Sequence, residues 1–195
     1  MDRNLKDLEV AGFVSSECGL NPETGKPSRV DRYRLKDSYI RFYLKYIEPH
    51  MEQIRNGGFE SIQLEGLPEW NAVMGLQFEN LVLNNVSELL PFLHLDHVPI
   101  LSAAPFRKSN VRTGGCQIDL LIQTRKSVFV VEVKRKNEIG EEVEREVAEK
   151  VARLSVPRDK SVRTALVYEG RLLPIVRANA YFDAIVDIAT MFEVQ

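Results

Sequence analysis

The sequence contains few of the features that mark secreted, membrane or repetitive proteins. It has only two cysteines among 195 residues, Cys18 and Cys116, so it cannot carry a disulfide framework, and we expect a cytoplasmic location. No apolar run approaches the roughly 20 residues that span a bilayer, and the N-terminal residues MDRNLKDLEV lack the pattern of a signal peptide. A composition that is 44% hydrophobic and 28% charged is instead typical of globular domains.

A large excess of charge of one sign is also missing, because the formal net charge is −2. This balance excludes a uniformly basic nucleic-acid-binding protein, but the charges are unevenly distributed. Residues 107–136 contain eight Lys or Arg and two acids, residues 26–45 contain seven and two, and residues 137–149 contain six Glu and one Arg. The two basic stretches predict surfaces that attract a polyanion, although solvated faces that happen to share one sign would give the same counts.

The most informative stretch is residues 115–136, GCQIDLLIQTRKSVFVVEVKRK. It predicts two strands rich in β-branched residues, joined by a polar turn at Thr124–Ser127. Side chains alternate between the two faces of a strand. Strict alternation places Gln117, Asp119 and Leu121 on one face of the first strand, and Ile118, Leu120 and Ile122 on the other.

Three charged residues interrupt these otherwise apolar strands: Asp119 in the first, and Glu132 and Lys134 in the second. An ionised group inside a buried strand is costly unless it is paired or bound to a metal. If the strands pair as a hairpin, the two acids and the lysine converge at one end of the sheet, which predicts a divalent-cation site. A buried ion pair with Lys134 is the alternative, but two acids and one lysine leave a negative charge that a cation would neutralise.

Asp119, followed after twelve residues by Glu132-Val133-Lys134, resembles the D…ExK signature of the PD-(D/E)XK, or restriction-endonuclease-like, superfamily of nucleases. The proline that usually precedes the first acid is replaced by Ile118. The segment GLQFENLVLNN adds to the resemblance, because Glu79 is similar to the acid on the first core helix of these nucleases. The resemblance implies an α/β fold with an αβββαβ core and a mixed sheet, which we place at residues 58–195.

The same resemblance implies a metal-dependent nuclease that hydrolyses phosphodiester bonds, with DNA as the expected substrate. Mg²⁺ or Mn²⁺ would be bound by Asp119, Glu132, the carbonyl of Val133 and Glu79. Lys134 would lie near the attacking water or the phosphate, so that Glu79, Asp119, Glu132 and Lys134 form the catalytic set. Contacts to nucleic acid are expected from Gln117, Arg112, Arg135 and Lys136. Cutting both strands of a duplex would normally need two copies of the chain, as a homodimer provides.

The first 57 residues predict a partial winged helix followed by an aromatic-rich helix. Residues 2–11 have helical spacing, Phe13-Val14 begins an extended segment, and residues 29–35 alternate like a returning strand. The run YRLKDSYIRFYLKYI resembles a segment of a family of prokaryotic ATPases, in which a P-loop module precedes a winged helix and a nuclease-like domain. This second resemblance implies a P-loop ATPase partner in cis or in trans, and a chain that is a C-terminal piece of such a protein or has lost its front half.

The P-loop pattern G-x-x-x-x-G-K-[ST] is itself absent from the sequence, so we expect no ATPase activity. Periodicity predicts the remaining elements. They are helices at 36–53, 69–90, 137–154 and 179–193, and strands at 98–106, 162–168 and 172–176. The glutamates of the third helix are expected to face solvent.

A second class of function stays open at this point. A nuclease-like fold can serve as a non-catalytic module that binds DNA or regulates a partner ATPase. The presence of Glu79, Asp119, Glu132 and Lys134 together speaks against this alternative, because a decayed site usually loses one of its residues. A domain that binds only protein would explain the fold but not the charged residues inside the strands.

Overall fold

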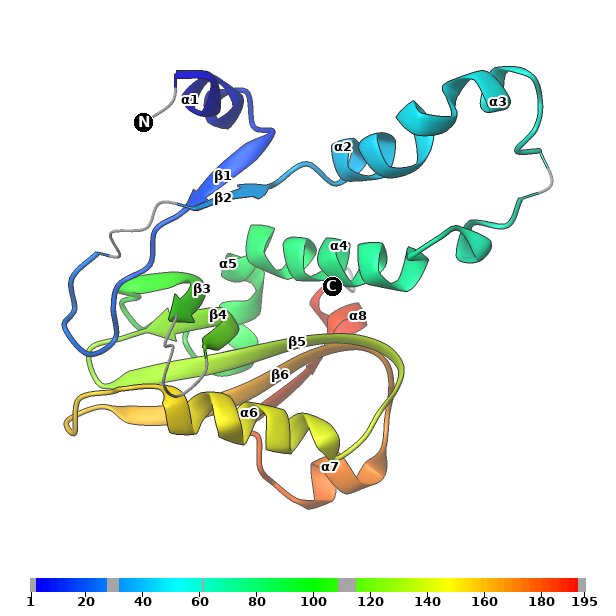
Figure 1. Cartoon of the computed structure of the whole chain (residues 1–195). Coiled ribbons are helices and arrows are strands. Elements are labelled where there is room, and N and C mark those ends of the chain that lie inside the picture. The colour runs from blue at the N-terminus through cyan, green and yellow to red at the C-terminus, as the bar shows by residue number, and fades with distance from the viewer. Residues whose placement is uncertain (1–2, 28–31, 61, 109–114, 193–195) are drawn as a thin grey trace.

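The computed structural model describes residues 3–27, 32–60, 62–108 and 115–192. The chain forms an α/β fold with a two-stranded antiparallel sheet and a five-stranded mixed sheet (Figure 1). The strands are β1 (Val14–Glu17), β2 (Arg32–Leu35), β3 (Ser102–Lys108), β4 (Cys116–Gln123), β5 (Ser127–Ile139), β6 (Ser161–Leu172) and β7 (Ala184–Asp187). The helices are α1 (Arg3–Val10), α2 (Ser38–Phe42), α3 (Met51–Arg55), α4 (Trp70–Asn84), α5 (Val86–Leu89), α6 (Glu142–Arg153), α7 (Pro174–Ala178) and α8 (Ile188–Met191).

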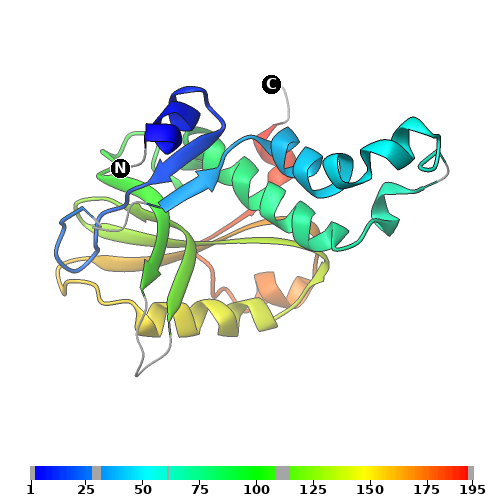
Figure 2. The same cartoon turned by 45° about the horizontal axis from the view of Figure 1, so that its top comes forward.

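The five-stranded sheet, ordered β3-β4-β5-β6-β7, lies between two helical layers. Strands β3, β4 and β5 are antiparallel neighbours, whereas β6 is parallel to β5 and β7 is parallel to β6. Helix α4 lies on one face and α6 on the other (Figures 1 and 2). A separate apolar core fills each interface, with Phe78 and Val82 of α4 in one and Val143 and Val147 of α6 in the other. Because both faces are covered, the central strands are almost continuously apolar.

The predicted hairpin turn between β4 and β5 is confirmed. The N–H of Thr124 donates to the Ser127 carbonyl at 2.9 Å, and the N–H of Ser127 donates to Thr124 Oγ1 at 2.9 Å. A threonine hydroxyl that accepts from the backbone in this way stabilises a tight turn without glycine.

The prediction of strict face alternation along β4 is wrong at Asp119. Ala104 of β3 pairs with Leu121 but Phe106 pairs with Ile118, so Asp119 and Leu120 together stand opposite one residue of β3. This is a β-bulge, which shifts the side chains beyond it by one position. As a result, the core on the α6 side contains Ile118 and Leu121, and the core on the α4 side contains Leu120 and Ile122.

Several predicted element boundaries also differ from the structure. The helix expected at 69–90 ends at Asn84 and is followed by α5 and a 3₁₀ turn at Leu90–Leu93. Strand β3 begins at Ser102, four residues later than predicted. The helix expected from 137 begins at Glu142, because β5 continues along β6 as far as the pair Ile139–Leu172.

The types of secondary structure predicted for the two C-terminal segments are wrong. Residues 172–176 form the end of β6 and the start of α7, where Pro174 occupies a first-turn position that suits helices. The segment expected as a closing helix contains β7, which pairs with β6, and the short α8. In the described part of the chain, no helix has both the length and the apolar character that crossing a bilayer requires.

The N-terminal region contains the expected helix and hairpin, α1 followed by β1 and β2; residues 28–31, which include the start of the predicted returning strand, lie outside the described residues. The helix predicted at 36–53 is broken into α2, a π-helical turn at Tyr43–Ile47, a 3₁₀ turn that contains Pro49, and α3. The sequence offers Asp37 or Ser38 as the cap of this helix, and the structure shows that Asp37 has this role, because its Oδ1 accepts from the N–H of Ile40 at 2.7 Å.

Polar side chains of α4 tie this N-terminal region to the main sheet. Asn80 is buried and donates to the Lys36 carbonyl at 2.6 Å, and Arg41 donates to Gln77 Oε1 at 3.1 Å. The α4 helix therefore packs its apolar side on the sheet and uses its polar side to hold the hairpin and α2 in place.

Gly170 provides a test of the β5–β6 pairing. Its φ of +121° lies in a region that L side chains rarely adopt, and a Cβ added there would lie 1.8 Å from the Lys136 carbonyl oxygen. We expect Gly170→Ala to lower the free energy of unfolding by about 2 kcal/mol or more, measured by urea denaturation.

The matched control for this test is Gly75→Ala in α4, where no atom lies within 4 Å of the added Cβ. Alanine is favoured over glycine in a helix by about 0.5–1 kcal/mol, so this variant should be slightly more stable than the parent. Equal effects of the two substitutions would contradict the β5–β6 register.

Candidate active site

The candidate site lies where β4 and β5 separate. Their pairing ends at Leu120 and Val131. Beyond that pair, β5 continues along β6 while β4 bends away together with β3 (Figure 2). Asp119 and Glu132 are the next residues on the two strands. The two strands no longer pair through their backbones here. The Asp119 side chain joins them instead, because its Oδ2 accepts from the N–H of Val133 at 3.0 Å.

The carboxylates of both predicted acids lie near the ammonium group of one lysine of α6. The ammonium of Lys150 makes a short contact with Glu132 Oε2 and lies 4.0 Å from Asp119 Oδ1. The Glu132 side chain is 1% exposed and that of Asp119 is 13% exposed. The bulge and the separation of the strands thus bring two buried carboxylates within reach of a single cation.

Lys134 completes this cluster on the second oxygen of Glu132. Its Nζ lies 3.0 Å from Glu132 Oε1 and 2.5 Å from Glu146 Oε2 of α6. Burial lowers the pKa of Lys134, but the ion pairs with Glu146 and Glu132 outweigh it and raise that pKa to about 12. Lys134 is therefore protonated at neutral pH, so it can neutralise charge and donate hydrogen bonds but cannot act as a base.

The surroundings of Asp119 disfavour its charged form, whereas those of Lys134 favour the charged form. Burial and repulsion from Glu132 raise the pKa of its carboxyl group, although Lys150 and the Val133 N–H oppose the shift. A carboxylate that is desolvated beside another carboxylate holds its negative charge at a cost. An added positive charge between the two would relieve that cost.

Glu79 lies on the α4 side of this cluster and is half-buried. Burial and the charge of Asp119 raise the pKa of Glu79, whereas Arg107 of β3 lowers it. Glu79 is therefore an electrostatic neighbour of Asp119. Within the residues that the structure describes, however, no three His, Cys, Asp or Glu side chains gather closely enough to hold a metal ion.

The donor set fits one magnesium or manganese ion bound through two carboxylates. Mg²⁺ accepts oxygen ligands and keeps several waters, so it does not need a complete protein cage. Asp119 and Glu132 already share one cation, the ammonium of Lys150, and a metal ion would take that place. A ligand role for the Val133 carbonyl, and one for Glu79, stay predictions.

The predicted nucleic-acid contacts differ in their surroundings. Gln117 is exposed on β4 and stands opposite Arg107 in the β3–β4 register. Arg135 and Lys136 each have an intramolecular partner, since Arg135 Nε lies 2.5 Å from Glu169 and Lys136 Nζ lies 3.7 Å from Glu142. Arg112 lies outside the described residues.

The sequence reasoning missed the two residues that α6 contributes, Glu146 and Lys150. The expectation that the glutamates of this helix face solvent is incomplete for Glu146, whose side chain is 42% exposed but contacts Lys134. A signal was available, because Val143, Glu146, Val147 and Lys150 are spaced i, i+3, i+4 and i+7 and so share one face of the helix. That face packs on the sheet, so its two charged residues must meet charges there.

Comparison with known proteins adds little to this geometry. No known family and no solved structure matches the chain. An uncharacterised protein of Methanocaldococcus jannaschii, MJECL04, is 29% identical over 96 residues, which cover 47% of this chain and 21% of that protein. The matched region spans about a fifth of the length of this relative, whose name states no activity.

Replacing Glu79 tests the electrostatic strain at the site. Because burial raises the pKa of Glu79, the folded state binds its proton more tightly than the unfolded state, and stability falls as the pH rises above the unfolded pKa. We expect Glu79→Gln to raise the melting temperature at pH 7.5 by roughly 2–4 °C and to have less effect at pH 4. Thermal unfolding at both pH values measures this, and a lower melting temperature at pH 7.5 would contradict it.

Replacing Lys150 tests whether its ammonium occupies a cation site. Lys150→Met leaves Glu132 buried with one partner fewer, so we expect the free energy of unfolding in EDTA to fall by about 3 kcal/mol. Mn²⁺ should restore more stability to this variant than it adds to the parent, because the ion no longer competes with an ammonium group. Thermal unfolding with and without Mn²⁺ measures both effects.

Arg153→Met is the matched control for Lys150→Met, since Arg153 lies on the same helix in an exposed pair with Glu149. Exposed pairs contribute about 0–1 kcal/mol, so this variant should resemble the parent. An equal response of both variants to Mn²⁺ would show that Lys150 does not mark a cation site.

Proposed function

We propose that this chain is a metal-dependent nuclease domain of the restriction-endonuclease-like type, which hydrolyses phosphodiester bonds with DNA as the expected substrate. The observation that carries the proposal is the convergence of Asp119 and Glu132, from two separating strands, on one cation beside the protonated Lys134. The order of elements supports it, because α4, three antiparallel strands, α6 and β6 follow one another as in an αβββαβ core.

The residues divide the chemistry between them. Asp119 and Glu132 would hold Mg²⁺ or Mn²⁺, which supplies an activated water and polarises the phosphate when bound. Lys134 stabilises the negative charge that develops on the phosphate, because its raised pKa keeps it positive. Glu146 orients Lys134 through their contact of 2.5 Å. Glu79, beside Asp119 on the α4 side, is suited to accept a hydrogen bond from a water in the site.

A non-catalytic, nucleic-acid-binding module is the second candidate, and one observation favours it. Lys150 already neutralises Glu132 and Asp119 from within the chain, so the cluster is stable as an ion-pair network without any metal. A calorimetric titration with Mn²⁺ separates the two candidates. Binding that is lost in Asp119→Asn supports the nuclease, and heat equal to that of buffer alone supports the module.

Plasmid cleavage tests the proposed activity directly. We expect the purified chain to nick or linearise supercoiled plasmid with Mg²⁺ or Mn²⁺ and to be inactive in EDTA. Asp119→Asn keeps the size of the side chain and an acceptor for the Val133 N–H, and Lys134→Gln keeps a hydrogen-bond donor. Each should reduce the cleavage rate about a hundredfold or more, measured by gel densitometry.

The control for this assay is Arg153→Gln, which removes an exposed cation of α6 that pairs with Glu149 and not with Asp119 or Glu132, and which should cleave at the rate of the parent. Cleavage that persists in both Asp119→Asn and Lys134→Gln would falsify the assignment, because it would have to come from another site or a contaminating nuclease.

A further inference from the structure

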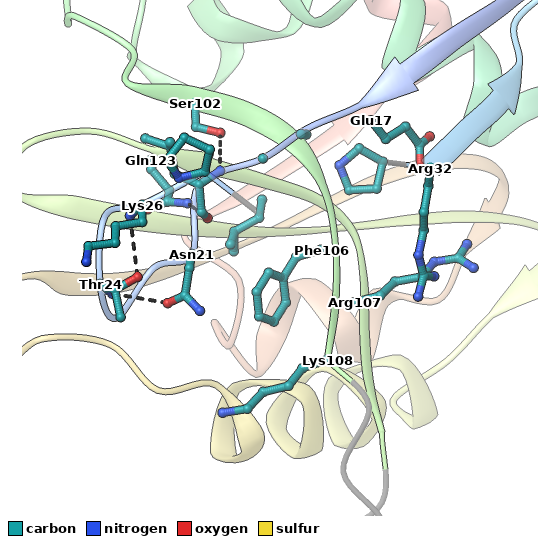
Figure 3. A pocket seen from close by; sticks show the side chains of 16 residues that line it. Glu17, Asn21, Thr24, Lys26, Arg32, Ser102, Phe106, Arg107, Lys108 and Gln123 are labelled. Carbon is teal, nitrogen blue, oxygen red and sulfur yellow. Dashed lines mark hydrogen bonds between the residues drawn. The ribbon is translucent and has the colours of Figure 1, made fainter. Parts of the chain in front are cut away.

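A groove lies between the β1–β2 hairpin and the edge strand β3, outside the cluster of acids. It has a volume of about 340 Å³ (Figure 3). Residues between Glu17 and Pro27, together with Arg32, line it on the hairpin side, and residues of β3 and β4 line it on the sheet side. Its lining includes four cations, Lys26, Arg32, Arg107 and Lys108, and one aromatic ring, Phe106. The two basic stretches of the sequence thus contribute to one surface.

The four cations of the groove are exposed, and none of them forms an ion pair with another residue in the described ranges. The acid in the lining, Glu17, is already paired with Arg34 at 3.1 Å. Like charges that share one surface repel one another, and an anionic ligand relieves that repulsion. Arg135 and Lys136 differ from them, because each is neutralised within the chain.

Phe106 lies between the cations. Its half-buried ring points into the groove, with Lys26 on one side and Arg32 and Arg107 on the other (Figure 3). Aromatic rings beside cations form platforms on which single-stranded bases stack while their phosphates are neutralised. A chain of phosphates that crosses the ring would meet positive charge before and after it.

The wall opposite the ring is fixed to the sheet. Leu20 N–H donates to Ser102 Oγ at 3.2 Å, and Gln123 Nε2, itself buried, donates to the Leu20 carbonyl at 2.5 Å. A Cβ added at Gly19 would lie 3.3 Å from Ala104 Cβ, so the hairpin packs closely against β3 there. Contacts between distant parts of the chain therefore hold the described part of this wall, at Gly19 and Leu20, against the sheet.

One end of the groove adjoins the candidate active site. Arg107 stands opposite Gln117, two residues before Asp119 on β4, and its charge acts on Glu79. A strand held by Arg107 would therefore pass close to the acids.

We propose that this groove binds single-stranded nucleic acid, with phosphates on Lys26, Arg32, Arg107 and Lys108 and a base stacked on Phe106. Its volume is in the range of sites for single small molecules, which suits one nucleotide unit rather than a duplex. The link to cleavage rests on the proposed function, but binding in the groove does not require the metal.

Fluorescence anisotropy in EDTA tests the groove without cleavage. The probe is a fluorescein-labelled oligothymidylate of about 12 nucleotides, and its duplex with oligoadenylate is the comparison. We expect the parent to bind the single strand more tightly than the duplex. Arg32→Gln and Arg107→Gln should each weaken binding and reduce the slope of log affinity against log salt by about 0.7, as expected for one lost phosphate contact to a single strand.

Phe106→Leu removes the aromatic face but keeps an apolar side chain on the core below it. We expect it to weaken single-strand binding about fivefold and to leave the salt dependence unchanged. The matched control is Arg55→Gln, an exposed arginine of α3, which should bind like the parent. Helix α3 lies at the end of the N-terminal region that is far from β1 and β2 (Figure 1). Thermal unfolding of each variant confirms that it is folded before binding is measured.

The outcomes separate this inference from the proposed function. If Arg32→Gln and Arg107→Gln bind no worse than Arg55→Gln, or if duplex binds as tightly and Phe106→Leu has no effect, the groove is not a single-strand site even if the chain cleaves plasmid. If the variants behave as expected but the parent cleaves nothing with Mg²⁺ or Mn²⁺, the groove stands and the nuclease proposal fails.

Discussion

The fold depends on how the buried carboxylate of Glu132 is satisfied. This side chain lies inside the central strand at 1% exposure, where an unpaired charge would cost several kcal/mol by the usual magnitudes for buried ions. Lys134 and Lys150 each contact one of its oxygens. Because Lys150 is part of α6, its contact with Glu132 holds that helix on the sheet with one face toward the strands. The position of the helix and the pairing of the buried charge on the strand therefore depend on each other.

In the same arrangement, the Lys150 ammonium group occupies the position that a metal ion would take between the two acids. Two acids on separating strands are suited to a divalent ion, yet an internal ammonium already lies between them. A protein that needed only stability would gain as much from apolar residues at these positions, because replacing buried ion pairs by packed hydrophobic groups is often neutral or favourable. Charged residues beside a bulge at Asp119 are therefore not required for stability alone, which is consistent with the function proposed above. Lys150 would then keep the acids in place until a metal ion binds.

The N-terminal hairpin has a structural part in this scheme. It is held to α4 through Asn80 and to the sheet through Ser102 and Gln123. These contacts place its loop against Ser102 and Ala104 of β3. They also bring Arg32 beside Arg107, although the two are 75 positions apart in the sequence numbering. The hairpin thereby converts two separate basic stretches into one groove next to the acids.

The sequence by itself determined the features that depend on local pattern: the β4–β5 hairpin and its turn, the apolar character of strands buried on both faces, the cap at Asp37, and the presence of Asp119, Glu132 and Lys134 within those strands. These follow from side-chain alternation and local hydrogen bonding. Only the tertiary structure decided the bulge at Asp119, the extension of β5 along β6, the strand β7 and the arrival of Lys150 at the acids. Each of these depends on a partner distant in the chain, and spacing along one strand or helix carries no information about what packs against it.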